Sequence, residues 1–112
     1  MKFVIVESPY AGNIEENIEY ARQCIRDCLV RGEAPFASHL LYTQPNVFRD
    51  EVPQERSLGI KAGHEIMKRA DLVVVYEDRG ISHGMVQGIE SAKSFRIPIE
   101  YRSIKNKDAS QS

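Results

Sequence analysis

Two apolar runs, Phe3–Val6 and Leu72–Val75, are each followed by a polar turn and the start of a helix. Apolar runs without alternation are typical of parallel strands that are buried on both faces. The turns read Glu7-Ser8-Pro9-Tyr10-Ala11-Gly12-Asn13 and Arg79-Gly80-Ile81-Ser82-His83-Gly84-Met85. Where a strand ends and a helix begins, free backbone N–H groups and the positive end of the helix dipole favour an anion. The sequence therefore predicts two anion-binding corners in one α/β domain, which favours a ligand of nucleotide size.

The rest of the chain alternates between helical and extended patterns. Helices are predicted at residues 13–31, 53–69 and 82–95, and further strands at residues 35–41 and 97–101. Asn13 can cap the first helix together with Glu16, and Gly32 can end it. Pro98 places the last strand at an edge of the sheet, because proline cannot donate a ladder hydrogen bond.

This order predicts an open parallel sheet of four to five strands with helices on both faces, in a flavodoxin-like or Rossmann-like arrangement. Residues 1–102 are expected to form a single nucleotide-binding-type α/β domain. Residues 103–112 are mostly polar and lack periodicity, so we expect a flexible C-terminal tail. Ligands of such sheets bind beyond the carboxyl ends of the strands, so the two corners should meet around one crevice.

Charge and composition exclude several classes of partner. The formal net charge of −1 lacks the basic excess of a protein that binds duplex nucleic acid. The apolar runs are too short to cross a bilayer and no secretory signal is visible, so we expect a cytoplasmic protein without a membrane partner. Cys24 and Cys28 have neither zinc nor redox spacing and are expected to pack inside a helix. We expect no metal and no cofactor.

The predicted ligand-binding residues come from the two corners and from the end of the second predicted strand. They are Ser8, Pro9, Tyr10, Gly12, Asn13, His39, Ser82, His83, Gly84 and Met85. Some have plain structural alternatives: Ser82 as a helix cap, His39 as a hydrogen-bonded histidine and Met85 as a core residue. Neither corner is a Walker A loop or a Gly-x-Gly-x-x-Gly turn, which favours a nucleoside or mononucleotide over ATP or NAD.

These motifs, in this order, resemble the nucleoside 2-deoxyribosyltransferase-like superfamily. The similarity rests on Ser-Pro-Tyr-x-Gly at residues 8–12, on Ser38-His39, and on Ala70-Asp71 with four apolar residues before Ile81-Ser82-x-Gly84-Met85. It covers residues 3–101 and is greatest to small phage and bacterial members, with the 2′-deoxynucleoside 5′-phosphate N-hydrolases as relatives. The resemblance implies a flavodoxin-like sheet, a nucleoside or nucleotide pocket, and a homodimer or higher homo-oligomer.

The resemblance also identifies a departure. Enzymes of the superfamily use a glutamate on the helix after the second corner, and the matching position here is Gly88. These enzymes also have an assisting aspartate on a helix, and the position that matches it here is Gly63. Cleavage of an N-glycosidic bond develops positive charge on the sugar, which a carboxylate must trap or stabilise. The leading hypothesis is therefore a nucleoside- or nucleotide-binding protein without glycosidase activity.

Two alternatives stay open. The first is an N-glycosidase or deoxyribosyltransferase that acts on a (deoxy)nucleoside 5′-monophosphate with a different carboxylate, such as Glu7 or one from a partner subunit. Asp78 and Glu90 are expected on the solvated surface. The second is an oligomeric interaction module without a ligand, whose assembly face carries Gly59 and Gly63.

Overall fold

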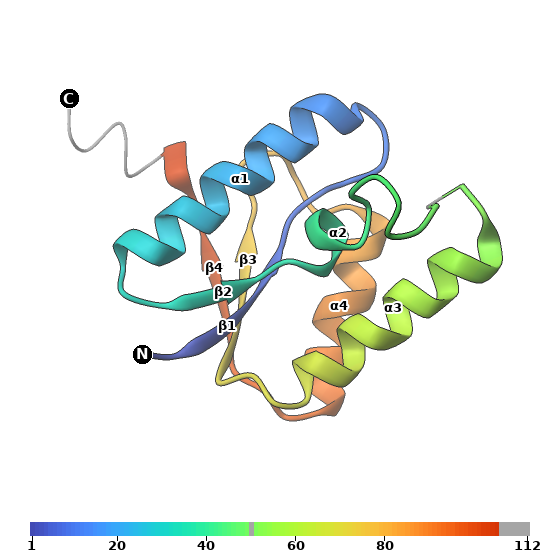
Figure 1. The fold of residues 1–112 in the computed structure, drawn as a ribbon. Helices are drawn as coiled ribbons and strands as arrows, with labels where there is room; N and C mark the ends of the chain where they lie inside the picture. Colours follow the sequence, from blue (N-terminus) through green and yellow to red (C-terminus); the bar gives the residue numbers. More distant parts are fainter. Residues whose placement is uncertain (50, 106–112) are drawn as a thin grey trace.

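The computed structural model describes residues 1–49 and 51–105. Four parallel strands form one sheet in the order β2-β1-β3-β4 (Figure 1). The strands are β1 (Phe3–Glu7), β2 (Ala34–Phe36), β3 (Leu72–Tyr76) and β4 (Ile99–Arg102). The helices are α1 (Ile14–Val30), α2 (Ser38–Leu41), α3 (Pro53–Met67) and α4 (His83–Ser94). The predicted fold class is confirmed.

The sheet separates two layers of core side chains. Val4 and Val74 pack with Cys24 and Cys28 of α1 on one face. On the other face, Val73 and Val75 pack against residues of α3 and α4, as the arrangement in Figure 1 also shows. All five residues of β3 are buried, which is why this strand reads as an uninterrupted apolar run. The expected packing of the two cysteines inside a helix is confirmed.

The predicted ends of α1 are also confirmed. The Asn13 side chain accepts a hydrogen bond from the backbone N–H of Glu16 at 3.3 Å. Gly32 follows the helix with a φ of +83°, a conformation that residues with a side chain rarely adopt. Asn13 therefore has a structural role at the start of the helix, whether or not a ligand is present.

The strand predicted at residues 35–41 is wrong in its second half. β2 ends at Phe36, and residues 38–41 form the short helix α2. The chain turns at Ala37, which is extended and buried, so that Leu40 packs against the core on the α1 side. Tyr42 returns to Phe36, with its ring centroid 6.1 Å away in an edge-on arrangement. His39 consequently lies on a helix and not at a strand end.

A buried polar network joins β4 to the α1 side of the sheet. Arg102, whose side chain is only 4% exposed, donates two hydrogen bonds to the Glu33 carboxylate at 2.6 and 2.8 Å. It also contacts the Tyr76 hydroxyl at 3.3 Å and the Glu100 carboxylate. As a charge removed from water requires, the buried guanidinium has charged and polar partners.

Asp78, expected on the solvated surface, instead connects three parts of the chain. Its carboxylate accepts hydrogen bonds from Tyr20 of α1 at 2.6 Å, from the Ser103 hydroxyl at 2.5 Å, and from the backbone N–H groups of Ile104 and Lys105. Desolvation alone would raise the pKa of Asp78, but these hydrogen bonds lower it to about 2. The first residues of the predicted tail are therefore tied to the loop after β3, and residues 106–112 lie outside the described residues.

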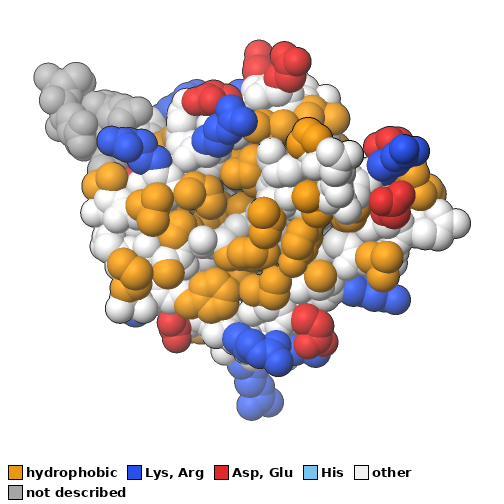
Figure 2. All heavy atoms as spheres, viewed as in Figure 1, with side chains coloured by type: hydrophobic (Ala, Val, Ile, Leu, Met, Phe, Trp, Pro, Cys, Tyr) orange, Lys and Arg blue, Asp and Glu red, His pale blue; other side chains and the backbone are white. Residues whose placement is uncertain are grey.

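Figure 2 shows hydrophobic side chains gathered at the centre of one face, around the edge strand β2, with charged side chains near the rim. Pro35 in the middle of β2 fits its position at the sheet edge. Within residues 1–49 and 51–105, no helix has the length and apolar character needed to cross a membrane.

Candidate functional site

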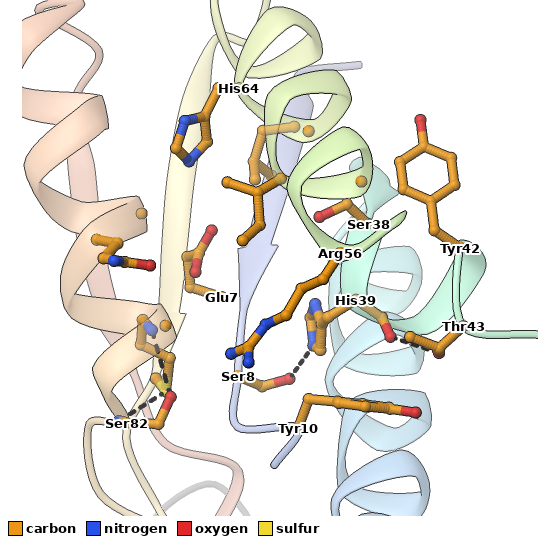
Figure 3. A pocket seen from close by; sticks show the side chains of 18 of the residues that line it. Glu7, Ser8, Tyr10, Ser38, His39, Tyr42, Thr43, Arg56, His64 and Ser82 are labelled. Carbon is orange, nitrogen blue, oxygen red and sulfur yellow. Dashed lines mark hydrogen bonds between the residues drawn. The ribbon is translucent and has the colours of Figure 1, made fainter. Parts of the chain in front are cut away.

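A cavity of about 220 Å³ lies beyond the carboxyl end of β1, between α2, α3 and α4 (Figure 3). β1 has β2 on one side and β3 on the other, so the cavity lies where the chain changes direction across the sheet. This is the position at which open α/β sheets bind ligands. Because this volume is below the ~300–1,000 Å³ of common small-molecule sites, the cavity suits a small ligand.

Most of the predicted binding residues line this one cavity. They are Ser8, Tyr10, His39, Ser82, His83, Gly84 and Met85. Pro9 faces a neighbouring hollow, while Gly12, with a φ of +98°, and Asn13 belong to neither lining. The two predicted corners are therefore brought together around one space, although ligand binding by each residue stays a prediction.

Ser8 and His39 make a short polar contact in the cavity wall. The Ser8 hydroxyl lies 2.7 Å from Nε2 of His39, so a hydrogen bond joins the loop after β1 to α2. Burial lowers the pKa of His39 to about 4, so the imidazole is neutral at pH 7. A neutral imidazole has one nitrogen that donates and one that accepts, and the Ser8 hydroxyl can do both. The two side chains can therefore form hydrogen bonds with the hydroxyl groups of a ligand.

Ser82 and Met85 have the structural roles that the sequence offered as alternatives. The Ser82 hydroxyl accepts a hydrogen bond from the Met85 backbone N–H at 3.2 Å, which caps α4. The Ser82 N–H donates to Sδ of Met85 at 3.4 Å. Met85 is buried in the core below the cavity, so the first turn of α4 is held rigidly at the cavity wall.

Glu7 is the last residue of β1, and its side chain points into the cavity between α3 and α4 (Figure 3). Within the described part of the chain, its carboxylate has neither a hydrogen-bond partner nor an ion-pair partner. Burial without a compensating charge raises the pKa of Glu7 to about 8. A carboxyl group in this state is typical of ligand sites and not of a structural contact.

The Glu7 carboxyl group takes the space that a side chain at position 88 would need. A Cβ atom built on Gly88 would lie 2.6 Å from the carboxyl carbon and from both oxygens. Gly88 is buried on the face of α4 that borders the cavity. In the sequence, the position that matches the catalytic glutamate of the superfamily is a glycine, Gly88. In the structure, the Glu7 carboxyl group, which comes from β1, lies in the space beside that glycine.

Aromatic side chains from the loop after α2 form another part of the lining. Tyr42 and Phe48 lie with their ring centroids 6.2 Å apart, and both line the cavity. The glycines of α3 make room for this side: a Cβ atom on Gly59 would lie 2.1 Å from the Phe48 ring, and one on Gly63 would lie 2.9 Å from the Ser38 hydroxyl. The glycine face of α3 is thus covered within the chain, which removes the feature that favoured an assembly face.

Several lining residues were not predicted, namely Ser38, Tyr42, Thr43, Phe48, Arg56, His64 and Gln87. Arg56 is the one lysine or arginine among the described lining residues, and Figure 3 shows its guanidinium directed toward Ser8 and His39. The signal that was available was the polar segment after α2, which contributes Tyr42, Thr43 and Phe48 to the lining. In the described residues, no three His, Cys, Asp or Glu side chains come together to hold a metal ion.

The fold is similar to that of 2-deoxyribosyltransferase structures. One match is a 2-deoxyribosyltransferase from the psychrotolerant bacterium Bacillus psychrosaccharolyticus, with a TM-score of 0.64 and 18% identity, covering 90% of this chain and 72% of that protein. Another is the enzyme from Leishmania mexicana, with a TM-score of 0.60 and 11% identity, covering 92% of this chain and 65% of that protein. At these identities, the likeness shows the fold.

The chain belongs to the family described as Domain of unknown function (DUF7768), whose model matches residues 2–102. No curated protein matches it. The fold expected from the resemblance is confirmed, and the relation to the deoxyribosyltransferase superfamily stays a prediction.

Proposed function

We propose that the cavity binds a nucleoside or a nucleoside 5′-monophosphate. The observation that carries this proposal is the meeting of both strand-end corners and an aromatic side around one cavity. The cavity thus has a polar side and an aromatic side. A nucleoside is divided in the same way, since its base has flat apolar faces and its sugar has hydroxyl groups. The 2-deoxyribosyltransferases that share the fold are, by their names, proteins that act on deoxyribosyl groups.

The base is proposed to lie toward Tyr42 and Phe48. Stacking on aromatic rings contributes about 1–3 kcal/mol per base in other nucleic-acid-binding sites. Tyr10, one of the predicted ligand-binding residues, lines the cavity as well. Because every base has a π-face, this side of the cavity supplies affinity without choosing the base.

The sugar and phosphate are proposed to lie toward Ser8, His39 and Ser82, at the ends of the strands. Ser8 and His39 can share their hydrogen bonds with sugar hydroxyl groups. Arg56 can place positive charge near a 5′-phosphate, for which guanidinium groups are well suited. The cavity therefore favours a ligand with one base, one sugar and at most a small anionic group.

Saturation-transfer NMR on the purified protein tests this proposal. The probes are the 2′-deoxynucleosides, the ribonucleosides and their 5′-monophosphates. We expect transfer to the base protons of at least one probe, and loss of that transfer in Gly84→Leu. A Cβ atom at Gly84 meets no heavy atom within 4 Å, so this variant can fold while its side chain narrows the cavity. No transfer to any probe, or equal transfer in Gly84→Leu, would overturn the proposal.

A further inference from the structure

We infer that Glu7 is the catalytic carboxylate of an N-glycosidic bond cleavage in this cavity, acting from the space that Gly88 leaves open. This inference rests on the proposed binding of a nucleoside or nucleotide. With this role for Glu7, the protein is an enzyme and not only a binding protein. Its catalytic carboxylate comes from the end of β1 and not from α4.

Glu7 differs from the other buried or half-buried carboxylates of the chain. Asp27 contacts Arg31 and Tyr76, Glu33 is paired with Arg102, and Asp78 accepts several hydrogen bonds. The Glu7 carboxyl group, in the described residues, has none of these compensations. Placing such a group in a cavity costs stability, so a role toward a ligand accounts for its position better than a structural role does.

Gly88, which lies on α4 beside the Glu7 carboxyl group, supports the same inference. A glycine inside a helix costs about 1 kcal/mol relative to alanine. Here, even the smallest side chain would reach within 2.6 Å of the Glu7 carboxyl group and displace it. The helix therefore carries an unfavourable residue at the one position where a better helix former would move Glu7.

The reaction needs one water molecule. The bond between C1′ and the base nitrogen breaks, and its electron pair stays on the nitrogen, which takes up a proton. Glu7 acts in the fraction of molecules in which it is ionised, where its carboxylate stabilises the positive charge that develops over C1′ and the ring oxygen. Water then adds to C1′ and releases a proton, so a nucleoside and water become a free base and a sugar. Burial supports this role, because an ion pair formed inside a cavity is less screened than one in water.

Base release can be followed by one-dimensional NMR, with saturation transfer in the same samples reporting binding. In Glu7→Gln, we expect release to fall by about 10²-fold or more, a loss typical of removing a catalytic group, while binding of the probe changes by less than about threefold. Glu90→Gln is the matched control, because Glu90 is an exposed carboxylate on α4 two residues from Gly88. It should release base at the wild-type rate.

A second pair of variants tests the geometry. Gly88→Ala should fold, because the atoms in its way are the end of a flexible side chain, and it should release base much more slowly. In Glu7→Ala/Gly88→Asp, the new carboxyl carbon lies about 1.5 Å beyond the Cβ position and so close to the original one. This double variant should regain activity over Glu7→Ala.

The outcomes separate the two proposals. Binding by the wild-type protein without base release overturns the inference and leaves the proposed function standing. Full activity of Glu7→Gln or of Gly88→Ala also overturns the inference. Absence of binding to every probe overturns the proposed function, and the inference with it.

Discussion

The Ser8 hydroxyl and Nε2 of His39 lie 2.7 Å apart and connect the loop after β1 to the helix α2. Ser8 is buried, and His39 is held neutral by its surroundings. The contact fixes two segments of the cavity wall that are distant in sequence. Because α2 begins directly after the turn at Ala37, that turn determines where His39 lies in the cavity wall.

The Ser8–His39 contact should be measurable as a coupling energy. Either single substitution, Ser8→Ala or His39→Ala, leaves a buried polar group without its partner and should lower the free energy of unfolding by about 1–3 kcal/mol. The double variant should lose less than the sum, with a coupling of about 0.5–1.5 kcal/mol in a urea-denaturation cycle. Strict additivity of the two effects would contradict a hydrogen bond between them.

Glu7 should make the stability of the protein depend on pH. Its pKa of about 8 in the folded state is above the ordinary value of 4.5, so the folded state binds more protons than the unfolded state between these values. The stability contributed by the protonated group is complete below about pH 4.5 and is lost as the pH rises toward 8. As the pH rises through this window, the free energy of unfolding of Glu7→Gln should therefore increase relative to that of the wild-type protein by up to about 1.4 kcal/mol per pH unit.

The other side chains of the cavity that carry or can take up a charge are unchanged in Glu7→Gln and cancel in that comparison. They are His39 on α2, Arg56 and His64 on α3, and His83 at the start of α4. Denaturation curves at pH 5, 6, 7 and 8 provide the measurement. A difference between the two proteins that does not vary with pH would show that Glu7 ionises as freely in the folded state as in the unfolded chain.

The packing of Phe48 against α3 should make the effect of a glycine substitution depend on the background. In the wild-type protein, Gly59→Ala places a Cβ atom 2.1 Å from the Phe48 ring and should lower the free energy of unfolding by about 1 kcal/mol or more. In a Phe48→Ala background, the same substitution should instead raise it by about 1 kcal/mol through helix propensity. Equal effects in the two backgrounds would argue against the contact.

The ion pair between Arg102 and Glu33 should contribute far more than a pair on the surface. Glu33→Ala leaves the buried guanidinium without its two-point partner and should cost about 3 kcal/mol or more. Glu65→Ala removes the exposed pair with Lys68, which water screens, and should have a far smaller effect on stability. Thermal unfolding of both variants checks this, and losses of similar size would contradict the assignment.

The central part of the fold could be predicted because its signals are local. The apolar runs of β1 and β3 identify buried parallel strands, and Asn13, Gly32 and Ser82 mark helix ends through side-chain and backbone chemistry. The stretch around His39 could not be assigned in the same way. A four-residue helix contains one turn, so periodicity does not distinguish α2 from the end of a strand.

The candidate site was predicted in outline only. The two corners follow from strand and helix ends, and Ser8 and Ser82 of these corners both line the cavity. The relation between Glu7 and Gly88 depends on the distance between side chains of β1 and α4, and no local pattern encodes it. Arg56 lies near the start of α3, and the sequence pattern of that helix does not show that its side chain lines the cavity.

Mapping of ligand contacts on the protein tests the central claim most directly. The measurement is a titration of isotope-labelled protein with the probe that shows the strongest saturation transfer, followed through backbone amide resonances. The account predicts the largest shifts at residues 7–11, 38–43 and 82–88, with β4 and the outer face of α1 unchanged. Shifts gathered elsewhere, or none at saturating probe, would show that this cavity is not a nucleoside site.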